Sequence, residues 1–316
     1  DEESQHGWLR PELRWLQAPQ AAPAAGYYYP ELVRHPVAVT NFREIFTNEE
    51  ANAEFSEYIA DRIRRRVKDP VVAEKLIPRD HGFGVQRVPM ETHYFEAYNR
   101  PNVHLVDISE TPIVRVTETG LRTTERDYDF DIVVYATGFD AITGAFDHID
   151  IRGVDGETLR DKWKDGPSTF LGMLIHGFPN LLMPAAPQSG SASPHYPRGI
   201  ETGVNWCTDL LEHMWEHGYI RAEATREAEE SWTAHVTQMY ATMLMRKAKS
   251  WFTGYNSNVP GHEHGRIRYF VYNGGSPKYV ARITEVAQKG YEGIVLTSAA
   301  PPLSGALLAR GGNAVS

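Results

Sequence analysis

One apolar stretch near the middle of the chain constrains the fold more than any other feature. In Asp131–Asp140, which reads DIVVYATGFD, five apolar residues lead from an acid into Thr137 and Gly138. A short apolar run that ends at a glycine predicts a buried strand followed by a sharp turn. Open parallel sheets bind ligands at the carboxyl ends of their strands, where a glycine lets the backbone approach closely. The stretch therefore favours an α/β fold with a ligand site at Gly138, although a core strand with a glycine stop gives the same pattern.

Composition narrows the classes of protein. The 316 residues include 41% hydrophobic side chains, which is enough for a sizeable core and for two domains. A net charge of -9 argues against nucleic acid or an anionic membrane as a partner. The chain lacks a signal peptide and an apolar run of about 18 residues, so we expect no membrane span and a cytoplasmic location. The single cysteine, Cys207, excludes the disulfide reductases, which need two.

Two helices are expected early in the chain. A capping box at Thr47–Glu50 precedes four apolar residues at four-residue spacing, which predict one face of a helix. They are Phe55, Ile59, Ile63 and Val67. Asp69 and Pro70 have the residue types of the cap and the first position of a second, short helix.

A later helix, over residues 201–217, is expected to bury one apolar face. That face contains Val204, Cys207, Leu210, Leu211 and Met214. The thiol on it is predicted to be inert, because burial disfavours the thiolate. Apolar residues that recur every three or four positions predict a longer helix over 223–248. Ser276 and Pro277 have the residue types that begin a helix, so they predict the start of a final one.

A constrained loop carries the candidate catalytic residue. Residues 76–90 place Arg87 among prolines and glycines, which restrict the backbone. An arginine held in this way can bind a phosphate bidentately, or stabilise an oxyanion that develops beside a cofactor. Taken alone, a loop arginine is more often a surface charge. The neighbouring residues decide between these interpretations.

The strings around Arg87 and Gly138 resemble those of the type I Baeyer–Villiger monooxygenases. P-x-D-x-x-F-G-x-x-R ends at Arg87, an aromatic segment follows over 94–107, and D-I-V-V-Y-A-T-G ends at Gly138. The resemblance implies a flavoprotein that uses FAD and NADPH, in which Arg87 contacts the nicotinamide and stabilises the negatively charged flavin peroxide. The residue before this arginine is usually a lysine near the NADP phosphates. Because this chain has Gln86 there, its preference for NADPH over NADH stays open.

The resemblance also assigns ligand contacts to later segments. After a predicted strand over 178–183, small residues and prolines lead into a helix near Arg198, which can offer backbone N–H groups to a ligand; composition alone fits an ordinary connector equally well. By position, Tyr196 contacts the flavin ring and Trp251 reaches the nicotinamide nucleotide. The implied cofactor-binding residues are Gln86, Arg87, Ala136, Thr137, Gly138, Tyr196 and Trp251. The implied substrate-binding residues are Ser191, Ala192, Ser193 and Pro194.

The implied fold class is α/β. The end of an NADP-binding domain with a helical insertion is joined to the carboxy-terminal part of a two-dinucleotide-binding FAD domain. The predicted divisions are 1–80, the helical part of the NADP-binding domain; 81–135, its end; 136–299, the carboxy-terminal part of the FAD domain; and 300–316, a disordered tail. No G-x-G-x-x-G string occurs, so the amino-terminal FAD and NADP fingerprint regions are missing. We therefore expect the carboxy-terminal portion of such an enzyme.

The implied reaction inserts one oxygen atom of O2 into a small-molecule ketone to give an ester or a lactone, with Arg87 as the catalytic residue. Two alternatives stay open: a flavin monooxygenase that oxidises nitrogen or sulfur and does not need Arg87, and an inactive fragment unable to bind FAD alone. A serine hydrolase is disfavoured, because Ser189 and His195 belong to no G-x-S-x-G elbow. No metal is expected, because His262 and His264 have no third ligand in view.

Overall fold

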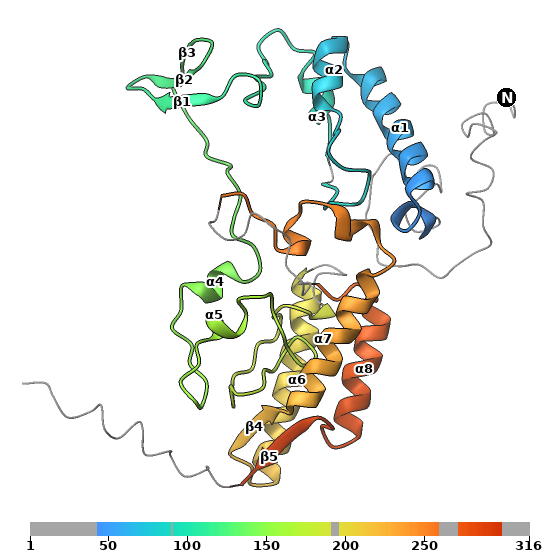
Figure 1. Cartoon of the computed structure of the whole chain (residues 1–316), viewed down its shortest axis with the longest axis vertical. Coiled ribbons are helices and arrows are strands. Elements are labelled where there is room, and N and C mark those ends of the chain that lie inside the picture. The colour runs from blue at the N-terminus through green and yellow to red at the C-terminus, as the bar shows by residue number, and fades with distance from the viewer. Residues whose placement is uncertain (1–42, 90, 191–195, 259–270, 299–316) are drawn as a thin grey trace, which may run out of the picture. The chain divides into compact units, whose positions relative to one another are not determined.

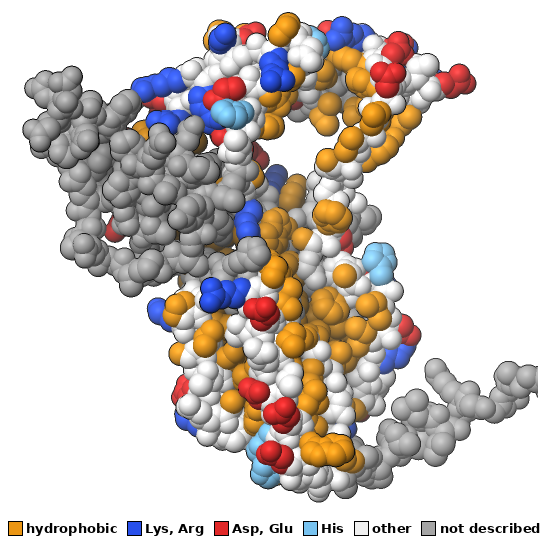
Figure 2. Space-filling model, turned by 180° about the vertical axis from the view of Figure 1, so that it is seen from behind, with side chains coloured by type: hydrophobic (Ala, Val, Ile, Leu, Met, Phe, Trp, Pro, Cys, Tyr) orange, Lys and Arg blue, Asp and Glu red, His pale blue; other side chains and the backbone are white. Residues whose placement is uncertain are grey.

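The protein, represented by a computed structural model, contains both helices and strands, in agreement with the predicted α/β class (Figure 1). The structure describes residues 43–89, 91–190, 196–258 and 271–298. The chain divides into two compact units, one made of 1–139 with 243–248 and the other of 140–242 with 249–316. Hydrophobic side chains remain on the surface of both units (Figure 2). No described helix has the length and apolar content that a membrane span requires.

The first unit contains the two predicted early helices. α1 spans Glu49–Arg66 and α2 spans Pro70–Leu76. Asp69 caps α2, because its side chain accepts the backbone N–H of Val71 at 2.8 Å. Small and branched side chains form the core that the two helices share: Ala60, Ile63, Val67, Ala73 and Ile77. The four-residue spacing thus places the apolar face of α1 against α2.

The cap of α1 differs from the prediction by one residue. The side-chain oxygen of Asn48 accepts the backbone N–H of Ala51 at 3.0 Å, so Asn48 and not Thr47 is the cap. The backbone N–H of Thr47 donates to the carbonyl of Glu44, 3.0 Å away, at the end of the short helix η3 (Arg43–Phe46). The predicted capping box is therefore wrong in its register.

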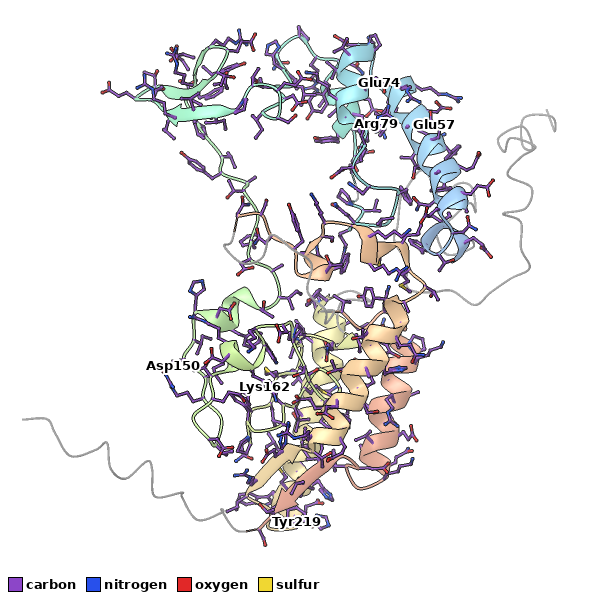
Figure 3. The ribbon with its side chains drawn as sticks, in the orientation of Figure 1. Glu57, Glu74, Arg79, Asp150, Lys162 and Tyr219 are labelled. Carbon is purple, nitrogen blue, oxygen red and sulfur yellow. The ribbon has the colours of Figure 1, made fainter. Side chains whose placement is uncertain are left out.

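Ion pairs fasten the end of α1. Arg66 bonds the carboxylates of Glu91 and Glu96, each at 2.6 Å, and so ties the short helix α3 (Tyr94–Ala97) to α1. Arg64 pairs with Glu57, Asp61 and Glu74, and Figure 3 labels Glu57 and Glu74 of this cluster. Because each guanidinium meets more than one carboxylate, these arginines have a structural role.

A three-stranded antiparallel sheet follows, in the order β1-β2-β3. Its strands are β1 (Ile113–Val116), β2 (Gly120–Thr123) and β3 (Asp127–Asp129). Gly120 allows a close approach across the sheet, because a Cβ there would lie 2.0 Å from the carbonyl oxygen of Tyr128.

The apolar stretch over 131–139 does not form the predicted buried strand. It has no regular secondary structure, and the side chains of Ile132, Val134 and Phe139 are 80%, 81% and 94% exposed. A strand needs a neighbour that accepts and donates its ladder hydrogen bonds, and no described segment pairs with this one. Gly138 has φ +88°, a conformation that favours glycine, but residues 132–141 form no turn, so the predicted sharp turn is wrong as well.

Three helices dominate the second unit (Figure 1). They are α6 (Tyr196–Glu216), α7 (Arg226–Tyr240) and α8 (Ser276–Gln288). The remaining elements are α4 (Gly144–Asp147), α5 (Leu159–Lys162), η6 (Trp251–Thr253) and the antiparallel pair of β4 (Arg221–Ala224) and β5 (Ile294–Thr297). The indole N–H of Trp206 on α6 donates to the carbonyl of Ile283 on α8 at 2.9 Å, which joins these two helices. α7 ends earlier than predicted; a 3-10 turn, η5 (Leu244–Lys247), follows in the first unit.

A buried carboxylate holds the loop before α6 against α7. Glu229, only 5% exposed, accepts the hydroxyl of Ser168 at 2.9 Å and the backbone N–H of His176 at 2.6 Å. The ammonium of Lys162, labelled in Figure 3, lies 3.0 Å from the same carboxylate. These contacts fix the loop in turns, so the predicted strand over 178–183 is absent.

The buried face of α6 is narrower than predicted. Cys207, Leu210 and Met214 are buried, but Val204 and Leu211 are 43% and 52% exposed, so their predicted inward positions are wrong. The helix is pressed against the loop before it at Gly203, where a Cβ would lie 1.8 Å from the carbonyl oxygen of Pro184. This close contact turns the positions of Val204 and Leu211 away from the core.

We expect the Arg66 cluster to make stability depend on pH. Hydrogen bonding to Arg66 lowers the pKa of Glu96 from 4.5 to about 2. A depressed carboxyl pKa stabilises the fold above pH 4.5, and this contribution is lost as the pH falls towards 2. The urea midpoint of Glu96→Gln should therefore lie below that of the wild type at pH 6 and approach it at pH 3. Glu118→Gln, at an exposed position, is the control and should leave the urea midpoint unchanged at both pH values. If the midpoints of Glu96→Gln and the wild type differed equally at pH 6 and pH 3, the role of the cluster would be contradicted.

Candidate functional site

Helix α1 anchors the loop that carries Arg87. The side-chain amide of Asn52, buried on α1, donates to the carbonyl of Phe83 at 2.8 Å, and the hydroxyl of Ser56 accepts the N–H of Phe83 at 2.8 Å. Gly84 then turns the backbone with φ +73°, a conformation that favours glycine. Arg87 follows three residues later and is exposed, although Val85 between them is buried. The guanidinium is therefore presented at the surface of the first unit from an anchored base.

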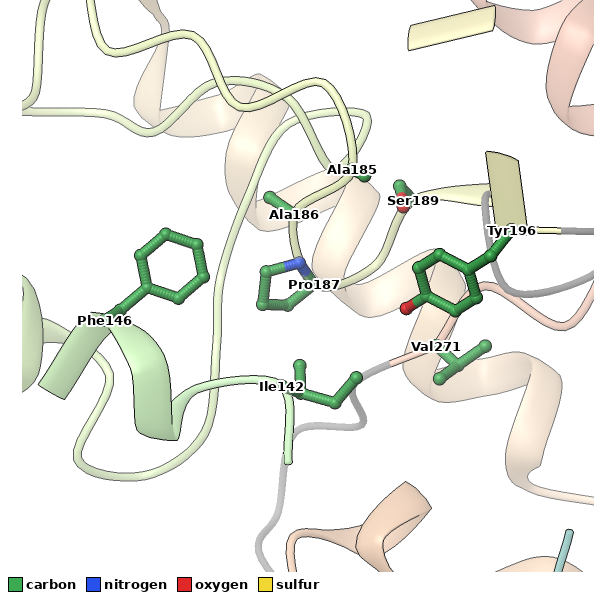
Figure 4. A pocket seen from close by; sticks show the side chains of 8 residues that line it. All are labelled: Ile142, Phe146, Ala185, Ala186, Pro187, Ser189, Tyr196 and Val271. Atoms are coloured by element: carbon green, nitrogen blue, oxygen red, sulfur yellow. The ribbon is translucent and has the colours of Figure 1, made fainter. Parts of the chain in front are cut away.

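A cavity of about 160 Å³ lies in the second unit (Figure 4). Most of its lining residues have apolar side chains, with hydroxyl groups from Ser189 and Tyr196, but polar atoms make up the larger part of the cavity surface. The lining residues are Ile142, Phe146, Ala185, Ala186, Pro187, Ser189, Tyr196 and Val271. Half of them belong to the loop over 185–189, which precedes α6, and Tyr196 is the first residue of α6. The cavity thus suits a small group that carries both apolar and polar atoms.

The cavity wall is fixed by Gln188, whose side chain is fully buried. The amide oxygen accepts the backbone N–H and the hydroxyl of Thr169 at 3.1 and 3.0 Å, and the hydroxyl of Thr233 at 3.2 Å. The amide nitrogen donates to the carbonyl of Pro167 at 2.9 Å. Gln188 also has φ +68°, which costs a side-chain-bearing residue about 1 kcal/mol. The hydrogen bonds offset this strain and hold the loop in one conformation.

Two glycines let this loop sit between its neighbours. A Cβ at Gly172 would lie 2.3 Å from the backbone nitrogen of Ser189, and a Cβ at Gly190 would lie 2.4 Å from the ring of Tyr279. The hydroxyl of Tyr279 donates to the carbonyl of Leu171 at 2.8 Å, and this bond joins α8 to the residue before Gly172. The wall of the cavity is therefore packed on both sides.

Trp251 lies on an ordered turn of the second unit. Its ring stacks on Phe252, with 4.0 Å between centroids, and the hydroxyl of Ser250 accepts the N–H of Phe252 at 3.3 Å. The side-chain amide of Asn256 donates to the carboxylate of Asp140 at 3.5 Å. This contact joins the Trp251 turn to the residue that directly follows the apolar stretch.

The structure separates the predicted site residues into two groups. Those in the first unit are Gln86, Arg87, Ala136, Thr137 and Gly138. Those in the second unit are Tyr196 and Trp251, of which Tyr196 lines the cavity. Ser191, Ala192, Ser193 and Pro194 lie outside the described residues. The contribution of Gln188 is absent from the prediction, and its only signal in the sequence is a polar residue within a loop of prolines and small residues.

The predicted inert thiol is confirmed. Cys207 is 6% exposed, and burial raises its pKa to about 11. A nucleophilic role would require a lowered pKa and access to solvent.

Comparisons with known proteins identify the relatives of this chain. No family model matches it. It is 42% identical over 274 residues to a 2-oxo-Delta(3)-4,5,5-trimethylcyclopentenylacetyl-CoA monooxygenase of Pseudomonas putida, covering 85% of this chain and 50% of the relative. It is 38% identical over 262 residues to a cyclopentanone 1,2-monooxygenase of a Comamonas species, covering 82% and 47%. The chain is related to the Baeyer–Villiger monooxygenases.

A solved structure has a similar fold over the region that matches. The crystal structure of OTEMO in complex with FAD and NADP matches with a TM-score of 0.73 and 42% identity, over 81% of this chain and 46% of that one. The chain thus spans about half the length of the Baeyer–Villiger relatives that it matches.

We expect Gln188→Leu to destabilise the protein by about 2–4 kcal/mol, because it leaves several buried donors and acceptors without their partner. Urea unfolding measures the loss. Gln238→Leu, on the exposed face of α7, is the matched control and should change the free energy of unfolding by less than about 0.5 kcal/mol. Equal effects of the two substitutions would show that the Gln188 amide is dispensable.

We also expect Cys207 to be protected in the folded protein. With a pKa of about 11, its thiolate population at pH 8 is small, and burial blocks reagents. Reaction with a disulfide reagent at pH 8 should be at least about a hundredfold slower in the native protein than in guanidinium chloride. Similar rates in both conditions would contradict the burial of this helix face.

Proposed function

We propose that the chain contributes the substrate-facing half of a monooxygenase that uses FAD, NADPH and O2 to convert a ketone into an ester or a lactone. The similarity to the cyclopentanone and 2-oxo-cyclopentenylacetyl-CoA monooxygenases carries this proposal. The likeness to a structure solved with FAD and NADP supports the choice of cofactors.

The second unit would bind the ketone. Ser189 and Tyr196, which both line the cavity, flank the segment that contains Ser191, Ala192, Ser193 and Pro194. This arrangement supports a role for the segment in substrate choice. The apolar wall accommodates the hydrocarbon part of a small ketone, and a hydroxyl can donate to its carbonyl oxygen. Tyr196, which lines the cavity, would contact the flavin ring. Trp251 would contact the nicotinamide nucleotide.

In the first unit, Arg87 would supply a positive charge near the cofactors, and Gly138 would let a cofactor come close to the backbone. Arg87 carries a guanidinium group, which could stabilise negative charge near the reacting atoms. Gln86 would lie beside the nucleotide. Gly138, after Ala136 and Thr137, has φ +88° and open space where a Cβ would be, so a ligand can come close to the backbone there. Bound FAD would supply the oxygen-transfer chemistry.

Replacing Arg87 tests this assignment. In a flavin-loaded enzyme, Arg87→Ala should lower ester formation from cyclopentanone at least about a hundredfold, because it removes a charge that acts only on the developing anion. Arg79→Ala, which removes an exposed arginine of the same unit, should leave the rate within about twofold. An ester yield from Arg87→Ala close to that of the wild type would contradict the proposed role of Arg87.

Flavin binding distinguishes the proposal from its alternatives. The chain is purified with added FAD, its visible spectrum is recorded, and NADPH is added to test for bleaching. If the proposal holds, the protein binds flavin and NADPH bleaches it. The flavin-loaded protein should then oxidise a cyclic ketone in preference to a thioether. Preferential oxidation of the thioether would favour the nitrogen- or sulfur-oxidising class, and colourless protein would favour a fragment that needs a partner to bind FAD.

A further inference from the structure

The end of α6 brings two histidine rings together, away from the candidate site. His213 and His217 are four residues apart, a spacing at which side chains meet on one face of a helix. Their ring centroids lie 4.2 Å apart, and the ring planes are inclined by 36°. We refer to these two residues as the α6 histidine pair. Tyr196, which lines the cavity, begins the same helix, so His213 lies roughly 25 Å from it along the helix axis.

A helix-ending motif fixes the position of His217. The backbone N–H of Tyr219 donates to the carbonyl of Met214 at 2.8 Å. The backbone N–H of Gly218, which has φ +69°, donates to the carbonyl of Trp215 at 3.3 Å. These two bonds form a Schellman motif, which holds the last turn of the helix. Tyr219, labelled in Figure 3, also stacks on His217, with 5.9 Å between ring centroids and 9° between planes.

A buried tyrosine from a distant part of the sequence packs against His213. Tyr291 follows α8 and is 5% exposed, and its ring centroid lies 5.0 Å from that of His213. Tyr291 also packs edge-on against Trp206 on α6, with 5.4 Å between centroids. Because each member of the α6 histidine pair packs against another ring, part of the side-chain entropy that a bound ligand would cost is already lost.

The hydrogen bond of His217 leaves one of its ring nitrogens to a metal ion. Its Nδ1 atom lies 2.9 Å from the carbonyl oxygen of His213. A carbonyl oxygen can only accept, so Nδ1 donates, and in the neutral ring Nε2 keeps its lone pair. Metal-binding histidines commonly donate their second ring N–H to a backbone carbonyl in this way, which fixes the ring.

The spacing of the two rings suits a chelated cation. Two metal–nitrogen bonds of about 2.0–2.1 Å at a right angle place the imidazole centroids roughly 4.5 Å apart, close to the 4.2 Å found here. A wider, tetrahedral angle would place the centroids roughly 5 Å apart. The spacing therefore favours an ion with right-angle coordination.

Nearby carboxylates supply a negative field for a cation. Burial raises the pKa of Tyr291 to about 12, and the charges of Asp209 and Glu212 add to this shift. The two carboxylates thus act on the same ring that contacts His213. A cation near the α6 histidine pair gains from this field, and the net charge of -9 on the chain acts in the same direction.

We propose that the α6 histidine pair binds one divalent transition-metal ion of the Ni²⁺ or Cu²⁺ class through one ring nitrogen of each histidine. Imidazole is a suitable ligand for both ions, and both accept right-angle positions. Within the described residues, no group of three or more His, Cys, Asp or Glu side chains could hold a metal ion, so water completes the coordination. The ion clips the last turn of α6 and takes no part in the candidate site.

Titration calorimetry with NiCl2 tests the site without flavin or substrate. The chain is purified without a polyhistidine tag and freed of metal by a chelator. We expect one Ni²⁺ per chain and at least a tenfold higher Kd for His213→Gln and for His217→Gln, because each removes one of the two ligands. His262→Gln combined with His264→Gln removes the other closely spaced histidines and should keep Kd within twofold.

Electron paramagnetic resonance of the chain loaded with Cu²⁺ gives a second readout. The spectrum should show coupling to two bound nitrogen nuclei, and each single variant should leave coupling to one. A role limited to capping the helix end would give no such coupling. Circular dichroism of the metal-free variants checks the fold, and the use of two separate positions guards against misfolding of either.

Three results would overturn the proposed metal site. One is the absence of saturable Ni²⁺ binding at concentrations up to about 1 mM. Another is a Kd that neither His213→Gln nor His217→Gln changes. The third is loss of binding in the variant that lacks His262 and His264, because the ion would then bind elsewhere in the chain.

Discussion

Buried side-chain amides hold in place the two loops that carry candidate site residues. In the first unit the amide of Asn52 bonds the carbonyl of Phe83 and so anchors the loop that leads to Arg87. In the second unit Gln188 bonds Thr169, Thr233 and the carbonyl of Pro167, and fixes the cavity wall. A carboxamide can donate and accept at once without burying a charge, so it satisfies loop backbone groups at low desolvation cost.

The loops also depend on charges placed deeper in the fold. Glu229 is almost fully buried, yet it accepts from Ser168 and His176 and lies 3.0 Å from the ammonium of Lys162. Such a carboxylate is tolerated because its oxygens are bonded, and removing one partner would leave an uncompensated charge. The segment from Ser168 to His176 is thus held against α7 by the buried carboxylate, and the amide of Gln188 holds the cavity wall.

Two apolar segments show how burial depends on the rest of a fold. The stretch over 131–139 has the composition of a central strand, and α6 has the apolar arc of a helix packed on two sides. The 131–139 stretch is exposed, and α6 buries only part of its apolar residues. The same apolar pattern can therefore be buried or exposed, depending on which other segments pack against it.

The sequence by itself determined the local elements and the family. Spacing and helix-start residues located α1, α2 and α8, although Asn48 and Gly275, not Thr47 and Ser276, cap α1 and α8. The strings ending at Arg87 and Gly138 indicated the Baeyer–Villiger relatives, because periodicity and motifs are properties of neighbouring residues. Only the tertiary structure decided what is buried. It exposed the 131–139 stretch and Leu211, and it made Gln188 the support of the cavity. Burial and side-chain hydrogen bonds depend on partners distant in the sequence, which no local pattern specifies.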